Sequence, residues 1–306
     1  SAPIAVYRSF RAAANGRTPN HRYLVSTASS SATIAAGWAG EGVAFCVASA
    51  TDVTLPVATS FKRIVSAASS PFTSGCNASS SGTLYAGGEV EPSLARNPIN
   101  PNHMIASWQQ DRWSNGGAQG TYGAVTFDGG LTWQSSAPAF SRCGGGNANN
   151  GGLYERASDP WGAISPDGVA YQMALGFSGT SFTADGLSAM LVSRSVDGGR
   201  TWAAPKTLVR DFSADVFHDK NTLTADPTSA AHVYAVWGRI LGDGSGPAWF
   251  ARTTDSGATW EAARPIYDPG ATNQTLGNQI VVLPNGMLLN IFFEIIRAES
   301  PANPLG

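Results

Sequence analysis

The stretch Asp128-Gly-Gly-Leu-Thr-Trp133 returns twice with small changes, as Asp197-Gly-Gly-Arg-Thr-Trp202 and as Asp255-Ser-Gly-Ala-Thr-Trp260. In each copy the Asp carboxylate can accept hydrogen bonds from backbone N–H groups of its own turn, while a glycine supplies the positive φ that a tight hairpin requires. Thr and Trp favour strands, and the indole ring buries a large apolar area. Each copy is therefore predicted to be a structural turn between two strands.

Short apolar runs surround these turns in a repeating order. A polar lead precedes a first strand, a turn and a second strand follow, and a loop then leads to a third strand, the Asp turn and a fourth strand. Three such units are followed by a fourth that contains two strands, at 279–283 and 287–293. Four short strands per unit of roughly 60 residues predict an all-β fold, a β-propeller with four-stranded blades. About three and a half blades are expected in residues 53–306.

The Asp turns resemble the Asp boxes, also called BNR repeats, of sialidase-like β-propellers. The phrases Gly88-Glu-Val-Glu-Pro92, Tyr154-Glu-Arg-Ala-Ser-Asp-Pro160 and Asp219-Lys-Asn-Thr-Leu223 are similar to secreted bacterial proteins of the exo-sialidase-like kind. The resemblance covers residues 53–306 and implies a ring that usually has six blades.

Residues 1–52 differ from the rest of the chain. Val6-Tyr-Arg-Ser-Phe10, Asn20-His-Arg-Tyr23 and the run from Gly37 to Cys46 resemble a small repeat module attached to secreted bacterial enzymes. Such modules are associated with binding to cell walls or glycans. We therefore expect two domains, an accessory module at 1–52 and the propeller at 53–306.

Composition narrows the classes of function. Charged residues make up 13% of the chain and the net charge is −2, which does not provide the basic surface that nucleic acids require. No apolar run reaches the length of about 18 residues that a membrane-spanning helix needs. Low charge and abundant Ser, Thr, Asn and Gly favour a secreted protein. The three cysteines, Cys46, Cys76 and Cys143, predict one disulfide and one free thiol, with the pairing left open.

Blade geometry predicts where the functional residues gather. When strands alternate in direction outward from the axis, the Asp turns share one rim with the turns between first and second strands. The loops that lead into the innermost strands, and the loops between second and third strands, then lie at the opposite rim. The catalytic candidates expected at that rim are Glu91, Asp159, Tyr154, Asp219 and Glu294, and the substrate-binding candidates are Arg112, Arg156, His218, Lys220, Arg239 and Arg297.

These residue types point to cleavage of a glycosidic bond. Paired carboxyls in unequal environments can act as general acid and base, and arginines bind a sugar carboxylate through forked hydrogen bonds, so an acidic sugar is one expected substrate. The sialidase resemblance implies a Tyr nucleophile activated by a Glu. Tyr154 is the candidate, with Glu91, Asp159 or Glu294 as its carboxylate partner. The Arg-Ile-Pro motif of the first sialidase blade is absent, which argues against sialic acid.

Two other functions fit the same residues, a non-catalytic propeller that binds carbohydrate or a surface, and a polysaccharide lyase. No cofactor is expected. A structural Ca²⁺ ion bound by the carboxylate-lined loops remains an open alternative. The expected partner is a glycan or polysaccharide. An incomplete ring of blades would expose sheet faces and an edge to water. We therefore also expect a second chain or fragment, or self-association, to complete the ring.

Overall fold

A computed structural model describes residues 4–11, 20–47, 69–77 and 82–296 of the chain. The chain divides into two compact units, Ser1–Phe61 and Lys62–Gly306. The domain boundary predicted between residues 52 and 53 lies in 48–68, outside the described residues. The two units are therefore described one at a time.

The first unit contains an antiparallel sheet and one helix. Its elements are β1 (Ile4–Arg11), β2 (Asn20–Leu24), α1 (Thr27–Ala35) and β3 (Ala39–Val47). The strands are ordered β2-β1-β3. The helix begins after Ser26, whose hydroxyl accepts a hydrogen bond from the backbone N–H of Ser29, and this contact satisfies a free donor of the first turn. No helix in the described part of the chain is long and apolar enough to cross a membrane.

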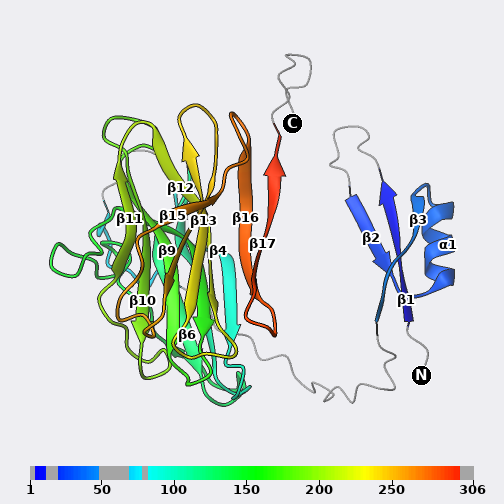
Figure 1. The fold of residues 1–306 in the computed structure, drawn as a ribbon, viewed down its shortest axis with the longest axis horizontal. Coiled ribbons are helices and arrows are strands. Elements are labelled where there is room, and N and C mark those ends of the chain that lie inside the picture. The colour runs from blue at the N-terminus through cyan, green and yellow to red at the C-terminus, as the bar shows by residue number, and fades with distance from the viewer. Residues whose placement is uncertain (1–3, 12–19, 48–68, 78–81, 297–306) are drawn as a thin grey trace. The chain divides into compact units, whose positions relative to one another are not determined.

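The second unit is built from antiparallel sheets that repeat along the chain (Figure 1). Blade 1 consists of β4 (Leu84–Arg96), β5 (Met104–Trp113), β6 (Ala118–Thr126) and β7 (Gln134–Ser135). Blade 2 consists of β8 (Arg156–Ile164), β9 (Ala170–Ser178), β10 (Leu187–Ser195) and β11 (Lys206–Phe212). Blade 3 consists of β12 (Val216–Ala225), β13 (Val233–Leu241), β14 (Ala248–Thr253) and β15 (Arg264–Tyr267). The described part of blade 4 consists of β16 (Gln274–Val282) and β17 (Leu288–Ile295).

Neighbouring strands of each blade are hydrogen-bonded in chain order, from the first strand to the last. The fold class predicted from the sequence, a β-propeller of about three and a half four-stranded blades, is therefore confirmed.

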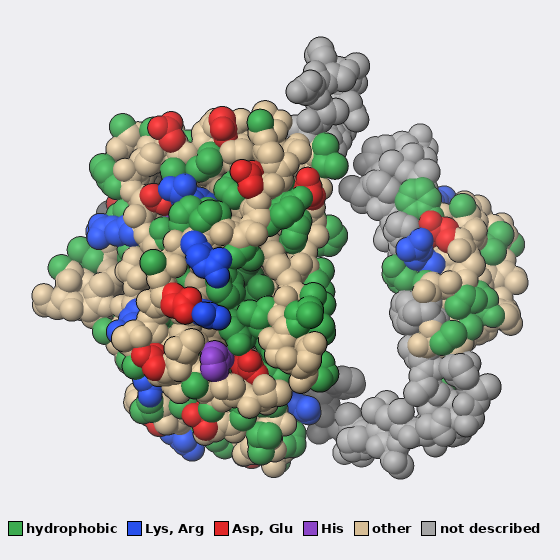
Figure 2. Space-filling model, viewed as in Figure 1, with side chains coloured by type: hydrophobic (Ala, Val, Ile, Leu, Met, Phe, Trp, Pro, Cys, Tyr) green, Lys and Arg blue, Asp and Glu red, His purple; other side chains and the backbone are tan. Residues whose placement is uncertain are grey.

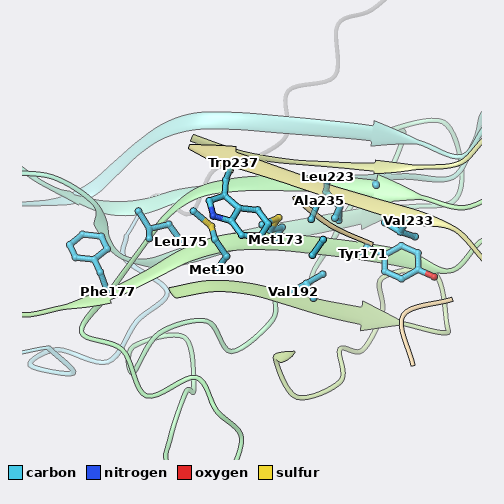
Figure 3. Packing of buried hydrophobic residues seen from close by; sticks show 12 residues of the cluster. Tyr171, Met173, Leu175, Phe177, Met190, Val192, Leu223, Val233, Ala235 and Trp237 are labelled. Carbon is cyan, nitrogen blue, oxygen red and sulfur yellow. The ribbon is translucent and has the colours of Figure 1, made fainter. Parts of the chain in front are cut away.

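Apolar side chains from successive blades pack together and form the core. Between blades 2 and 3, Met173 and Met190 are fully buried beside Trp237 (Figure 3). Fully burying one such side chain contributes about 1.5–3 kcal/mol, so each interface holds its two sheets in a fixed relation. The corresponding clusters join blades 1 and 2 through Ile105, Val125, Ile164 and Ala170, and blades 3 and 4 through Tyr234, Val236, Phe250 and Ile280.

The three Asp turns are closed by the same hydrogen bonds. Asp128 accepts the backbone N–H of Thr132 at 2.9 Å and its hydroxyl at 2.6 Å. These bonds from Thr132 lower the pKa of Asp128 to about 2. Asp197 and Asp255 make the equivalent pairs of bonds with the threonines at 201 and 259.

The Asp turns also join one blade to the next. A ring nitrogen of His103 in blade 1 lies 2.7 Å from the carbonyl oxygen of Gly198 in the blade 2 turn. The hydroxyl of Tyr171 in blade 2 donates to the carbonyl of Ser256 in the blade 3 turn at 2.9 Å. These contacts give the turns a structural role at the blade interfaces.

One disulfide fixes a segment beside the propeller. Cys76 and Cys143 are bonded, whereas Cys46 is a free and exposed thiol. The bond ties residues 69–77 to the loop that follows β7, and Phe72 of this segment packs edge-on against Tyr122. The pairing that the sequence left open is therefore Cys76–Cys143.

Candidate functional site

The innermost strand of every blade contains a β-bulge at the equivalent place. The pairing shifts by one residue in β4, β8, β12 and β16. One residue of each bulge has a positive φ, at Glu91, Asp159, Lys220 and Gly277. Such backbone is costly for residues other than glycine and is concentrated at functional sites, and a bulge re-aims the side chain that it carries. Three of these four matching positions hold ionisable side chains.

The bulges surround a groove with a volume of about 280 Å³. All four innermost strands contribute to its lining, through Glu91, Asp159, Trp161, Lys220, Asn221 and Gln279 among others. The sequence predicted that Glu91, Asp159 and Lys220 meet around one axis, and the structure brings these three together.

Lys220 connects carboxylates that come from two other blades. Its Nζ lies 3.1 Å from Oε1 of Glu91 and 3.5 Å from Oδ2 of Asp159. Its backbone N–H also donates to Oδ2 of Asp159 at 3.1 Å. Burial lowers the pKa of the Lys220 ammonium, but the negative charges of Asp159 and Glu91 outweigh this effect and hold the pKa above its ordinary value. The groove therefore keeps one cation between two acids.

Asp219 lies next to this cluster, and its pKa is higher than that of an ordinary aspartate. Burial, followed by repulsion from Asp159, raises the pKa of Asp219 to about 6, although the positive charge of Lys220 opposes the rise. A carboxyl that is half protonated near pH 6 is suited to donate a proton as a general acid. The site thus holds carboxyl groups in unequal environments.

Neutral polar side chains orient the acids. Gln109 is buried in β5 and donates to Oε2 of Glu91 at 2.6 Å. The side-chain amide of Asn221 donates to the carbonyl of Asp159 at 2.9 Å. Neither residue is among those predicted from the sequence, because both are neutral and the predicted site residues are ionisable. The available signal was the polar pair at 109–110 inside an apolar second strand.

The predicted position of the acids relative to the strands was wrong. Glu91, Asp159 and Asp219 lie within β4, β8 and β12, not in the loops that precede these strands. Pro92 and Pro160 follow two of them, and proline ordinarily marks the edge or start of a strand because it cannot donate to the ladder. At a bulge the missing N–H is tolerated, so the strands continue through both prolines.

The loop positions predicted for Arg112, Arg239 and Glu294 are also wrong, because these residues lie within β5, β13 and β17. Each residue belongs to the second strand of its blade. These strands extend beyond the apolar runs from which they were predicted.

Tyr154 does not line the groove. It is 3% exposed and packs with Phe140 and Leu191. Burial raises the pKa of its phenol, so ionisation to a nucleophile is disfavoured. The structure therefore gives no support to the tyrosine nucleophile implied by the resemblance.

The predicted arginines are engaged elsewhere. Arg112 and Arg156 each donate to a backbone carbonyl of the turn at 116–117, at 2.7 Å. Arg239 pairs with Asp211 at 3.2 Å and lies over the ring of a tryptophan in β14. None of the three lines the groove at the bulges.

His218 lies in β12 next to Asp219 and is fully buried. The indole N–H of Trp237 donates to its Nδ1 at 3.1 Å, so the ring proton is on Nε2, which lies 2.8 Å from the carboxylate of Asp211. Burial lowers the pKa of His218 despite this carboxylate, and the ring is neutral near pH 7. His218 therefore anchors β12 beside Asp219.

The remaining predictions concern Glu294, Arg297 and a structural Ca²⁺ ion. Glu294 accepts a hydrogen bond from the hydroxyl of Tyr267 at 2.9 Å, on the exposed side of β17. Arg297 lies outside the described residues. Within the described ranges, no group of three or more His, Cys, Asp or Glu residues is placed to hold a metal ion.

No protein-family model and no curated protein matches the sequence. Among solved structures, the chain is similar to a Hadza microbial sialidase, with 20% identity, a TM-score of 0.41, and coverage of 60% of this chain and 39% of that one. It is similar to a Penicillium chrysogenum α-L-arabinanase, with 17% identity, a TM-score of 0.46 and coverage of 67% and 57%. It is also similar to a Fusarium graminearum α-L-arabinofuranosidase, with 13% identity, a TM-score of 0.48 and coverage of 70% and 59%. The chain spans less than two thirds of each of these proteins, and the likeness is one of fold.

Proposed function

We propose that the protein is a glycoside hydrolase whose active site is the groove at the four bulges. The observation that carries this proposal is the pair of carboxylates, Glu91 and Asp159, that Lys220 joins in the groove, with Asp219 and its pKa of about 6 at the preceding position of β12. Asp219 acts as the general acid that protonates the leaving oxygen. Asp159, held by the Lys220 N–H and by the hydroxyl of Ser158 at 2.6 Å, acts either as the base that takes a proton from the attacking water or as the nucleophile that bonds to the anomeric carbon before water hydrolyses the intermediate.

The substrate that this groove favours is a neutral glycan. Among the described residues, Lys220 is the cation that lines the groove, and two carboxylates already contact it. An acidic sugar, which the sequence also suggested, would therefore meet negative charge without an arginine fork to bind its carboxylate.

Hydrolysis assays on defined glycans test the proposal. The panel contains arabinobiose, other neutral oligosaccharides, sialosides and uronides, and release of reducing ends is measured. We expect the wild-type protein to cleave a neutral glycan, and Asp219→Asn and Asp159→Asn to lose roughly 100-fold or more in rate. Asp243→Asn is the control, because this exposed acid lies in a turn after β13 and does not line the groove. Cleavage that neither variant slows would overturn the site, and binding without cleavage would support the carbohydrate-binding alternative instead.

A polysaccharide lyase is supported less well. A lyase needs a base that can reach the substrate, and two candidates are Tyr154 and His218. Both are buried, and both ring nitrogens of His218 are already hydrogen-bonded.

We also infer that the protein is extracellular and acts on a glycan or polysaccharide there. The Cys76–Cys143 disulfide supports this location, because disulfides persist in oxidising compartments.

We propose, finally, that further sheets cover two open faces of the propeller unit. A groove of about 420 Å³ on blade 1 is lined by Val90, Leu94 and Trp108, and Leu94 is 62% exposed. On β17, Ile291 and Phe293 are 59% and 76% exposed. Figure 2 shows apolar side chains gathered along the edge where β17 lies. The equivalent surfaces of the inner interfaces are covered by the next blade, so a second chain, a fragment or another copy of this chain would bury both faces.

A further inference from the structure

Two adjoining grooves lie away from the bulges, beside the connection between β10 and β11. The first has a volume of about 260 Å³ and lies between blade 2 and the Asp turn of blade 3. The second has a volume of about 380 Å³ and lies between the segment after β7 and the Asp turn of blade 2. Ala203 and Ala204 line both grooves, so the two form one continuous surface.

The charged side chains of this surface all have the same sign. Among the described residues that line it, Arg194, Arg200 and Lys206 are the charged ones, and no Asp or Glu is present. Asp197 and Asp255 in the neighbouring turns are charged as well, but neither lines the surface, and each carboxylate accepts hydrogen bonds from its own threonine. The lining of the surface is therefore cationic.

Arg194 has unused hydrogen-bonding capacity. Its Nε–H is buried and has no acceptor among the described residues. A guanidinium presents five N–H donors in a planar fork that matches a carboxylate. Because a buried donor without a partner is unfavourable, the fold alone does not explain why the Nε–H of Arg194 is placed here.

Each groove also has one indole ring in its lining. Trp202 donates through Nε1 to the hydroxyl of Ser136 at 2.9 Å, which fixes the ring. Trp260 is half-buried against the core between blades 2 and 3. Rigid aromatic faces of this kind provide large contact area to ring-shaped ligands and lose little entropy on binding.

We propose that this surface binds a carboxylate-bearing polysaccharide and that it is separate from the groove at the bulges. The cations contact the carboxylates, with Arg194 able to form a forked pair, and the two indoles contact sugar rings of the same chain. The proposal requires no catalysis, so it stands whether or not the central groove hydrolyses a glycan.

Affinity electrophoresis tests the proposal, with polygalacturonate or neutral dextran cast into the gel. We expect the wild-type protein to be retarded by polygalacturonate and not by dextran. Arg194→Gln and Lys206→Glu should each weaken the affinity for polygalacturonate by about tenfold, because each variant loses a charge-assisted contact with a carboxylate. The retardation should also decrease as salt is added.

Arg96→Glu is the matched control for Lys206→Glu, since Arg96 is an exposed cation at the end of β4 and lines neither groove. Asp219→Asn tests independence from the central groove, and both variants should bind as the wild type does. Equal affinity in Lys206→Glu and wild type, or an equal loss in Arg96→Glu, would overturn the proposal. So would equally strong retardation by dextran, which would assign binding to the indoles alone. Circular dichroism confirms that each variant is folded.

Discussion

At the scale of single residues, the proton affinity of Asp219 should be visible in the stability of the protein. Its pKa is about 6 in the fold, against 3.8 for an unperturbed aspartate. A carboxyl whose pKa is raised by folding stabilises the fold at low pH, and this contribution is lost as the pH rises through about 6. Asp219→Asn removes the titration. We therefore expect the variant to match the wild type below about pH 4 and to be more stable by on the order of 2 kcal/mol at pH 7. Urea unfolding at a series of pH values measures the difference.

Asp128→Asn is a control for which the pH dependence of stability should have the opposite sign. The bonds from Thr132 lower the pKa of Asp128 to about 2, so its contribution is present above pH 4 and is lost as the pH falls toward 2. This variant should be less stable than the wild type at pH 7, with the difference shrinking in acid. If the two variants showed the same pH dependence, the opposite environments assigned to these carboxyls would be incorrect.

At the scale of elements, the disulfide should stabilise the fold by fixing the segment at 69–77. Cys76 and Cys143 are 67 residues apart in sequence, and closing a loop of this length is worth about 2–4 kcal/mol. We expect the double variant Cys76→Ser/Cys143→Ser to lose about this much free energy of unfolding. Guanidinium denaturation measures it, and dithiothreitol should produce a similar loss in the wild type and none in the double variant. Cys46→Ser is the control, because that thiol is free and exposed. Equal stability of the double variant and wild type would show that the segment is held without the bond.

The elements also show what a sequence can and cannot predict here. The Asp turns and the order of strands were predictable because each turn is closed by residues within a few positions, such as Asp128 and Thr132. The bulges were not predictable, because Pro92 and Pro160 locally indicate the start of a strand and only the partner strand shows that the ladder continues. The burial of Tyr154 depends on packing between distant segments, which spacing along the chain does not reveal.

At the scale of the whole molecule, the two open faces should make the purified chain associate. β17 is paired with β16 on one side, and among the described strands none pairs with its other edge. An unpaired edge beside exposed apolar side chains is a template for another sheet. We therefore expect sedimentation equilibrium to give a mass above the 31.7 kDa of one chain.

A matched pair of substitutions locates the association. Ile291→Asp places a charge on the open face of β17, and Leu131→Asp places one at an equally exposed position in an Asp turn, since both side chains are 59% exposed. The first variant should shift the equilibrium toward the single chain because a buried, unpaired carboxylate is costly, whereas the second should leave the mass unchanged. A wild-type protein that sediments as a monomer of 31.7 kDa, or an equal effect of both variants, would mean that these faces do not drive association.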